Sequence, residues 1–368
     1  MRKFVFALLL ALCLAALVFV LIAKRHGPTN SEQFAATFSD TRARAERGEA
    51  DAQSELGKMY FEGRGVAQDD AQAVLWWRKA ADQGNARGQN NLGVSYMEGR
   101  GVAQDYAQAR TWIQRAADQD LALAQNNLGW MYSKGKGVSK DDAQAVAWYR
   151  KAADQGDALA QGNLGLTYSE GKGVAKDDAQ AVAWYRKAAD QGNAKAQAKL
   201  GQMYRQGRGV AGDDAQAVVW YGKAADQGNA FAQAELGDMY KQGRGVPRDD
   251  EQAVTWYRKA ADQGNDYAQA GLGDMYKIGR GVEQDDEQAV TWYRKAADQG
   301  NDYAQASLGE MYEEGRGVAR DDAKAVDWYR KAADQENAFA KHKLDKLNQS
   351  GCGIARSDGC RRDSSPRL

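Results

Sequence analysis

The chain has 368 residues, and its 50 lysines and arginines balance its 50 aspartates and glutamates. No segment holds a long run of one sign, which argues against a protein that binds nucleic acid through phosphate contacts. The three cysteines, Cys13, Cys352 and Cys360, lie outside the regular part of the sequence, which excludes a disulfide framework or a cysteine-built zinc site there.

The first element in chain order is an unbroken apolar run at residues 4–23, flanked by Arg2 and Lys3 before it and by Lys24 and Arg25 after it. A run of this length matches the thickness of a bilayer. It lacks the shorter apolar region and the small-residue cleavage site of a signal peptide, so we predict an uncleaved anchor, with a linker that completes the segment 1–30. The slightly larger positive charge before the run favours an amino terminus in the cytoplasm and repeats outside it.

A helical segment at residues 31–48 follows the linker. Its phenylalanines Phe34 and Phe38 are four residues apart and therefore share one helix face. The end of the segment aligns with the end of each later repeat. We interpret it as a half repeat that caps the amino-terminal end of the repeated part.

The main part of the chain, residues 49–348, has a period of 36 residues. A Leu-Gly pair recurs in it without a register slip. The leucines of the pair are Leu56, Leu92, Leu128, Leu164, Leu200, Leu236, Leu272 and Leu308. An unbroken period of this length is typical of stacked repeats, in which neighbouring units bury one another's apolar faces, so we predict eight repeats in one elongated all-α domain.

Each repeat is predicted to contain two helices, and the sixth illustrates the pattern. The residues on the predicted core face of its first helix are Ala232, Leu236, Met239 and Tyr240. Gly237 has no side chain, so we expect the paired helix to approach closely there.

The second helix of the sixth repeat is predicted to open at Asp249. Gln252, three residues later, completes a capping-box pattern that satisfies amides at the helix start. Gly264 supplies the left-handed residue that ends the helix. Trp256 and Tyr257 belong to its apolar face and therefore to the core or its edge.

Three positions depart from the pattern. Asp120 replaces the glycine that ends the second helix, and Arg110 replaces a valine of the same repeat, so we expect a local irregularity between the second and third repeats. Glu336 replaces the same glycine in the eighth repeat.

The chain ends with a half repeat and a tail. Asp345 stands where the other units have glycine, and the helix has a lysine-rich side, which predicts a capping helix with nothing stacked beyond it. From residue 349 to 368 the period stops, and the composition predicts a disordered tail in which Cys352 and Cys360 could form a disulfide.

The repeat resembles that of the Sel-one-like repeat (SLR) family, a relative of the tetratricopeptide repeat. The residues that carry the match in the sixth repeat are Leu236, Gly237, Tyr240, Gly243, Gly245, Val246, Asp249, Ala253, Trp256, Tyr257, Lys259, Ala260 and Ala261. The resemblance implies a right-handed α/α superhelical solenoid with half-repeat caps, used as a protein-binding adaptor, mostly in bacterial envelope, signalling, secretion and virulence contexts. We therefore expect an inner-membrane anchor with periplasmic repeats. Cytoplasmic repeats, or a cleaved and soluble periplasmic protein, are the alternatives.

No pattern in the sequence predicts an enzyme. Some cysteine-rich members of the family bind or hydrolyse β-lactams, but the cysteine pair that they carry in each repeat is missing here. The Gly-Arg-Gly turns lack the residues that follow in a nucleotide-binding loop, and pairs such as Asp213 and Asp214 suit helix capping better than Ca²⁺. Without a nucleophile and base pair or a metal-ligand cluster, we predict no catalytic residue, cofactor, metal or small-molecule substrate.

The positions that the fold leaves free indicate a binding face. In related solenoids the first helices line the concave surface, so the first-helix residues beside the core leucine are candidate partner contacts. These candidates are Arg87, Asn91, Leu123, Asn127, Trp130, Leu159, Asn163, Leu166, Phe231, Glu235, Asp238, Tyr267, Asp274, Tyr303 and Glu310. Asparagines in the first half suit an extended peptide backbone, and aromatic and acidic residues in the second half suit basic and apolar side chains.

The sequence thus predicts a membrane-anchored periplasmic scaffold that binds a protein or peptide and no nucleic acid. Binding of peptidoglycan or polysaccharide by exposed aromatic residues is one alternative, and a merely solvated face is the other. Trp130 is one of two tryptophans outside the regular row, which favours binding. We expect Trp130→Ala to weaken partner capture without changing thermal stability.

Overall fold

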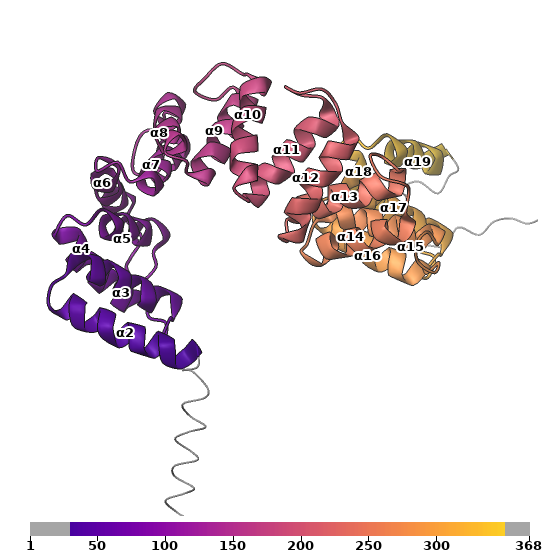
Figure 1. Ribbon diagram of the computed structural model, residues 1–368. Helices are drawn as coiled ribbons and strands as arrows, with labels where there is room; N and C mark the ends of the chain where they lie inside the picture. Colours follow the sequence, from indigo (N-terminus) through magenta and orange to yellow (C-terminus); the bar gives the residue numbers. More distant parts are fainter. Residues whose placement is uncertain (1–29, 350–368) are drawn as a thin grey trace, which may run out of the picture. The chain divides into compact units, whose positions relative to one another are not determined.

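The computed structural model describes residues 30–349, and all regular structure in that range is α-helical (Figure 1). The described residues divide into two compact units, which lie within Met1–Lys176 and Asp177–Leu368. None of the described helices is both long and apolar enough to cross a membrane. The predicted anchor at residues 4–23 and the cysteines of the tail lie outside the described residues, so both stay predictions.

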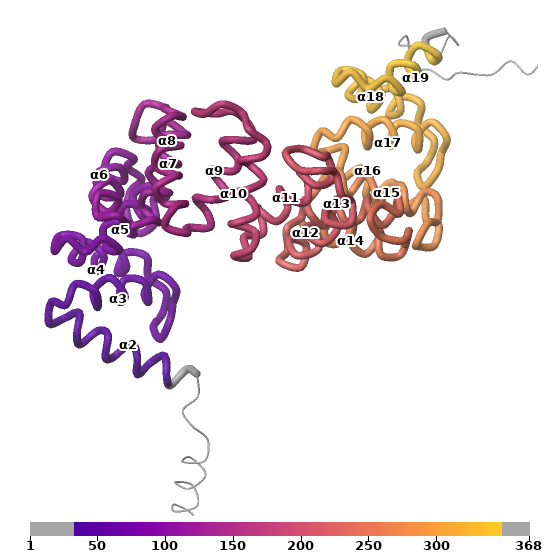
Figure 2. The backbone as a smooth tube through the Cα atoms, turned by 45° about the horizontal axis from the view of Figure 1, so that its top comes forward, coloured from indigo at the N-terminus to yellow at the C-terminus, as the bar shows by residue number. Residues whose placement is uncertain are grey.

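The first unit is a series of helices in which each packs against the next along the chain (Figure 2). Its helices are α2 (Asn30–Glu46), α3 (Ala50–Glu62), α4 (Asp70–Asp82), α5 (Ala86–Glu98), α6 (Tyr106–Ala117), α7 (Ala122–Lys134), α8 (Asp142–Asp154) and α9 (Ala158–Glu170).

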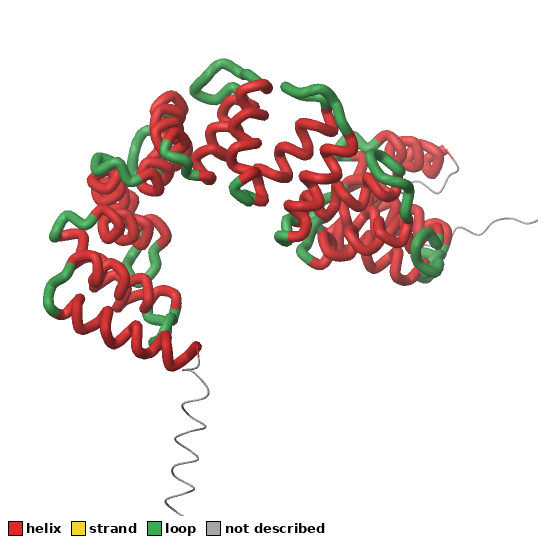
Figure 3. Tube along the Cα trace, in the orientation of Figure 1, coloured by secondary structure: helices red, strands yellow, loops and turns green. Residues whose placement is uncertain are grey.

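The second unit repeats the arrangement, with a loop between every two helices (Figure 3). Its helices are α10 (Asp178–Asp190), α11 (Ala194–Gln206), α12 (Asp214–Asp226), α13 (Ala230–Gln242), α14 (Asp250–Asp262), α15 (Asp266–Ile278), α16 (Asp286–Asp298), α17 (Asp302–Glu314), α18 (Asp322–Ala333) and α19 (Ala338–Gln349). The all-α solenoid of helix-turn-helix repeats that the sequence predicts is confirmed within each unit.

The core of each repeat forms where its two helices pack, and the sixth repeat again illustrates this. Ala232, Leu236 and Met239 of α13 are buried, as predicted. Gly237 faces Tyr257 of α14, and a Cβ on Gly237 would lie 2.8 Å from the tyrosine ring, so the absence of a side chain is what lets the helices approach. Burying a leucine of this row contributes about 1.5–3 kcal/mol to folding.

The second helices are capped as predicted, with one difference. The Asp249 carboxylate accepts a 2.9 Å hydrogen bond from the backbone N–H of Gln252. A full capping box would return the Gln252 side chain to the Asp249 amide, but that amide donates instead to the carbonyl of half-buried Tyr240 at 3.0 Å. This bond ties the start of α14 to α13. At the far end Gly264 has a φ of +86°, the left-handed conformation predicted for it.

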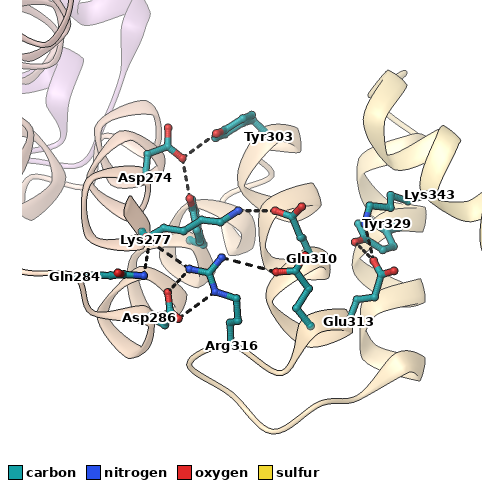
Figure 4. Close-up of polar contacts among 12 residues, drawn as sticks. Asp274, Lys277, Gln284, Asp286, Tyr303, Glu310, Glu313, Arg316, Tyr329 and Lys343 are labelled. Atoms are coloured by element: carbon teal, nitrogen blue, oxygen red, sulfur yellow. Dashed lines mark hydrogen bonds and ion pairs between the residues drawn. The ribbon is translucent and has the colours of Figure 1, made fainter. Parts of the chain in front are cut away.

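An arginine fastens the loop within each of several repeats to the preceding repeat, an arrangement we name the turn clamp. Arg280, just after α15, donates to both carboxylate oxygens of Asp250 at 3.1 and 2.5 Å. Asp250 is the first residue of α14, where a negative charge also suits the helix dipole. The same clamp joins Arg100 to Asp70, Arg208 to Asp178, Arg244 to Asp214, and Arg316 to Asp286, the last pair drawn in Figure 4.

The clamp between the second and third repeats has neither of its usual partners. Tyr106 stands where the other second helices begin with aspartate, and Lys136 stands where most turns have arginine. The Lys136 ammonium lies 4.9 Å from the centroid of the Tyr106 ring, a cation–π contact in place of the ion pair. The junction is therefore kept with different chemistry.

Little irregularity is present at Asp120, where the turn keeps the backbone hydrogen bonds of the other repeats. Asp120 has a φ of +59° and Glu336 a φ of +70°, the left-handed conformation that glycine adopts at this position in the other repeats. The helices before them, α6 and α18, have 12 residues instead of the 13 of the other second helices. Each chain segment still makes the turn, at the cost of a strained side-chain-bearing residue.

We expect Glu336→Gly to raise the melting temperature by about 1–3 °C, because glycine adopts the left-handed conformation without strain, while its freedom in the unfolded chain offsets part of the gain. Asp120→Gly should gain less, since aspartate tolerates this conformation better than glutamate. Thermal unfolding followed by circular dichroism measures both. A larger gain at Asp120 than at Glu336 would contradict the explanation.

A second stabilising change concerns Gly222 in the middle of α12, where a Cβ would meet nothing within 4 Å. Most other second helices have an arginine here that donates to a tyrosine of the next repeat, as Arg258 does to Tyr276 at 2.8 Å. Gly222→Ala should raise the free energy of unfolding by about 1 kcal/mol through helix propensity alone. Gly222→Arg should raise the free energy of unfolding at least as much as Gly222→Ala, and the restored hydrogen bond should add about 0.5 kcal/mol. A free energy of unfolding in urea that is lower for Gly222→Arg than for Gly222→Ala would refute this.

Candidate partner-binding face

First helices of neighbouring repeats lie side by side within each unit, as α3 and α5 do in one and α13 and α15 in the other. Of the predicted contact residues, those with exposed side chains are Arg87, Leu123, Leu159, Leu166, Phe231, Tyr267 and Tyr303. Those that are half-buried are Asn91, Asn127, Trp130, Asn163, Glu235, Asp238, Asp274 and Glu310. The half-buried members mostly bond within the protein, so their first role is to join repeats.

In the first unit the asparagines form a ladder between repeats. The Asn127 amide donates to Asn90 at 2.9 Å, and the Asn163 amide donates to Asn126 at the same distance. Asn90 and Asn126 are buried, and the sequence analysis missed them, although Asn-Asn pairs at the same register were the available signal. The ladder uses one N–H of Asn127 and one of Asn163, which leaves each of these two amides a second N–H donor for a partner.

Trp130 has a different environment from the one expected. It is half-buried and packs against the buried cluster that contains Ile113 and Leu128. Removing its ring would therefore leave a gap beside the core and lower thermal stability. The sequence-based expectation of unchanged stability in Trp130→Ala assumed a free ring, so we replace it with an expected loss, and the half-exposed Leu159 is a cleaner probe of the same face.

In the second unit, aspartates hold the tyrosines of the face by their hydroxyls. The Asp274 carboxylate accepts hydrogen bonds from Tyr293 at 2.7 Å and from Tyr303 of the next repeat at 2.8 Å (Figure 4). Burial raises the pKa of Tyr303, and Asp274 raises it further. Burial and the nearby Asp238 carboxylate do the same to the pKa of Tyr267. Both rings are thus half-exposed and also fixed in position.

Charged residues on this face pair from one repeat to the next. The pairs are Arg205 with Glu235, Lys241 with Asp274 at 3.6 Å, and Lys277 with Glu310 at 2.5 Å. The carboxylates that the sequence predicts as partner contacts are therefore already close to cations of the protein. Burial nevertheless raises the pKa of Glu235.

The face of the second unit contains a pocket of about 290 Å³, which we name the tyrosine pocket. Its lining includes Tyr257, Tyr267, Tyr303, Asp274, Lys241 and Gly271. The pocket exists because Gly271 stands where the same register carries a larger residue in the other repeats. Those residues are Glu55, Asn91, Asn127, Asn163, Lys199, Glu235 and Ser307. The sequence analysis missed Gly271, Lys241 and Tyr257, although a glycine in the middle of a helix, where it is costly, was a usable signal.

Two hollows of the first unit are smaller than the tyrosine pocket. The first is more polar, and the second is explained by the packing of aromatic side chains. The first, of about 240 Å³, is lined by Arg44, Asp51 and Arg87 among others. The second, of about 190 Å³, lies beside Phe61 and Trp77. Neither is bordered by two half-exposed aromatic rings, so the tyrosine pocket is the better developed site on the described residues.

Comparison with protein families finds one match. The family model for the Sel1 repeat matches eight consecutive segments, at residues 50–85, 86–121, 122–157, 158–193, 194–229, 230–265, 266–301 and 302–337. Comparison with curated proteins gives no match.

Two of the solved structures that resemble this chain cover most of it. One is c5321, a protective antigen present in uropathogenic Escherichia coli strains that displays an SLR fold. It is 42% identical, with 86% of this chain and 68% of that chain covered and a TM-score of 0.74. The other is a Sel1 repeat protein from Oxalobacter formigenes, 37% identical, with 89% of this chain and 92% of that chain covered and a TM-score of 0.60.

Proposed function

The chain belongs to the Sel1 repeat family, whose members mediate protein–protein interactions, and from that premise we propose that it is a periplasmic scaffold anchored in the inner membrane by residues 4–23. Its partner is a protein or peptide that binds the first helices. The family's solenoid typically serves as a non-catalytic interaction scaffold, and we extend this to the present chain.

One observation supports the first-helix face most directly. Large apolar side chains that are exposed belong almost entirely to first helices or to the terminal helices α2 and α19. Leu75 and Val219 are the exceptions among the described residues, on α4 and α12. Exposed apolar groups gathered on one face are typical of an interaction surface, whereas scattered ones need no explanation.

The partner-binding function predicts a difference between faces that crosslinking can measure. A photoreactive residue at Leu159 or Tyr267 in the full chain should capture a protein in living cells, and the same residue at Leu75 or Val219 should capture none or much less. All four side chains have similar exposure, between 48% and 52%, so accessibility is matched. Equal capture from both faces, or capture from neither, would refute the proposal.

The membrane location is supported by the apolar run and its flanking charges alone. A reporter fused after Leu368 tests it: alkaline phosphatase is active only outside the cytoplasm, and a fluorescent protein of the ordinary kind only inside it. Phosphatase activity in the membrane fraction is the expected result. A fluorescent fusion without phosphatase activity would mean cytoplasmic repeats, and phosphatase activity in the soluble periplasm would mean a cleaved leader.

The absence of catalysis is also part of the proposal. Among residues 30–349 no group of three histidine, cysteine or acidic side chains is placed to hold a metal. A chromogenic β-lactam offered to the purified full-length protein should not be hydrolysed above the buffer rate. Turnover that scales with protein concentration would contradict this.

Peptidoglycan or polysaccharide binding remains the second candidate because Tyr267 and Tyr303 expose aromatic rings on which a sugar could stack. The row of tryptophans on the second helices suits sugars less. Its rings are buried or half-buried and covered by lysines, as Lys259 lies 4.0 Å from the Trp256 ring centroid. Retention by purified cell wall that is lost in Tyr267→Ala would favour this candidate over a protein partner.

A further inference from the structure

The tyrosine pocket has the chemistry of a site for a cation. Its lining includes Tyr257, Tyr267 and Tyr303, residues whose aromatic rings attract positive charge, together with the acidic residue Asp274. Because the Tyr303 hydroxyl is held by Asp274, that ring needs no ordering when a ligand enters.

The protein already places a cation at the edge of this pocket, but loosely. The Lys241 ammonium lies 6.0 Å from the Tyr257 ring centroid and 3.6 Å from the Asp274 carboxylate, which is too long for a hydrogen bond. By contrast, the Asp274 carboxylate receives two tyrosine hydroxyls at 2.7 and 2.8 Å. Lys241 can therefore move aside for a better-fitting cation at little cost.

The charge of the surrounding helices favours a basic partner. On α17 the charged residues are Asp302, Glu310, Glu313 and Glu314, all of them acidic. The helices α13 and α15 each carry two acidic residues and one lysine. The helix α14, which contributes Tyr257, carries three acidic and two basic residues. The field along the four helices that line the pocket is therefore negative, which attracts a segment rich in basic side chains and repels an acidic one.

We propose that the tyrosine pocket binds the side chain of an arginine in a basic, extended segment of the partner protein. This inference rests on the partner-binding function proposed above and names the partner's chemistry. A guanidinium is planar, stacks on aromatic faces and can give a carboxylate two hydrogen bonds, whereas an ammonium is a compact and strongly hydrated charge. The tyrosine rings match the first property. Both tyrosine hydroxyls donate to Oδ1 of Asp274, so Oδ2, which faces only the loosely held Lys241 ammonium, is the oxygen that accepts from the guanidinium.

Gly271→Asn is the variant that closes the pocket with the least risk to folding. Asparagine occupies the same register in three other repeats, and at Asn163 it lies after a second helix whose Tyr149 corresponds to Tyr257. A Cβ at residue 271 would lie 3.1 Å from the Tyr257 ring, a contact that a shift of a few tenths of an ångström relieves. Asparagine also suits a helix better than glycine, so the melting temperature should hold or rise.

The experiment measures the binding of fluorescein-labelled peptides to the full-length protein in detergent by anisotropy. The probes are a flexible glycine-serine peptide carrying three arginines and its matched lysine, citrulline and glutamate versions. The arginine peptide should bind tightest, and citrulline, which keeps the plane but loses the charge, should bind about tenfold more weakly. Gly271→Asn should weaken the arginine peptide about tenfold, while the control Val219→Asn on the outer face of α12 should not change it.

Lys241→Met separates the two possible ligand charges. If the pocket takes a guanidinium, removing the competing ammonium tightens the arginine peptide about threefold. If it takes a carboxylate, the variant loses the glutamate peptide. Preference for glutamate, equal binding of the arginine peptide by Gly271→Asn and the parent, or weaker arginine binding in Lys241→Met would each overturn the inference.

The failure of this inference differs from a failure of the proposed function. If crosslinking from Phe231, which is exposed on α13 and is not among the pocket residues, captures a partner equally in the parent and in Gly271→Asn, the scaffold function holds and the arginine site is wrong. If no first-helix position captures a protein, the scaffold function is wrong, whatever the peptides show.

Discussion

Gly281→Ala should lower the free energy of unfolding by about 3–4 kcal/mol. Gly281 lies in the loop of the seventh repeat with a φ of +67°, and a Cβ there would come within 3.0 Å of the Asp250 carbonyl, in the backbone of the preceding repeat. A side chain in this conformation costs about 1–2 kcal/mol, and a clash with fixed backbone adds about 1–3 kcal/mol. The backbone at Asp250 cannot move freely because Arg280 also holds its side chain.

A matched variant separates strain from the clash. Gly264 has a φ of +86° and nothing within 4 Å of the Cβ position, so Gly264→Ala should cost only the strain, about 1–2 kcal/mol. Urea unfolding of both variants followed by circular dichroism gives the comparison. Equal losses would mean that the close approach of the loop to the preceding repeat contributes nothing.

The second large effect is a loss of stability at alkaline pH that is concentrated in the second unit. Tyr257, Tyr293 and Tyr329 are buried, and burial raises the pKa of each, with the carboxylates Asp238, Asp274 and Glu313 raising it further. These tyrosines release a proton above about pH 10 in the unfolded chain but keep it in the folded one, so stability falls as the pH rises. Each contributes about 1.4 kcal/mol per pH unit, or about 4 kcal/mol for the three.

Of the corresponding positions in the first unit, Trp77 and Ile113 do not titrate, and only at Tyr149 does burial raise the pKa of a tyrosine. We therefore expect the first unit to remain folded where the second unfolds, a difference that limited proteolysis at about pH 11 and at about pH 8 would reveal. Tyr293→Phe should reduce the slope of stability against pH by about 1.4 kcal/mol per pH unit and leave the Tyr303 bond to Asp274 in place. Uniform alkaline unfolding of both units would show that the buried tyrosines are not its cause.

The sequence was sufficient to predict the fold because each repeat has the same residue types at the positions that determine its core, its helix contacts and its caps. Leu236, Gly237 and Asp249 have the burial, the close helix contact and the helix cap that their residue types predict. The two repeats that lack the glycine after the second helix also follow this rule, since Asp120 and Glu336 occupy that position and adopt glycine's backbone conformation. Because the same local contacts recur in all eight repeats, they largely determine how each repeat packs on its neighbour.

The candidate face was less predictable, because its side chains bond across repeats. Asp274 looks free in its own helix, yet its hydroxyl donors come 19 and 29 residues later in the chain. The half-burial of Trp130 likewise depends on Ile113 of another helix. Periodicity identifies which residues face the same side, but not which of them neighbouring repeats have already engaged.

The turn clamp also constrains how a gene for such a chain can be rearranged. Asp250 pairs with Arg280, and the next clamp begins at Asp286. A crossover between residues 280 and 286 therefore separates no clamp partners, whereas a breakpoint almost anywhere else in the period splits a clamp pair. Duplications that exchange DNA within this short loop would lengthen the protein with every turn clamp intact, and they would carry Tyr106 and Lys136 together as one inherited unit.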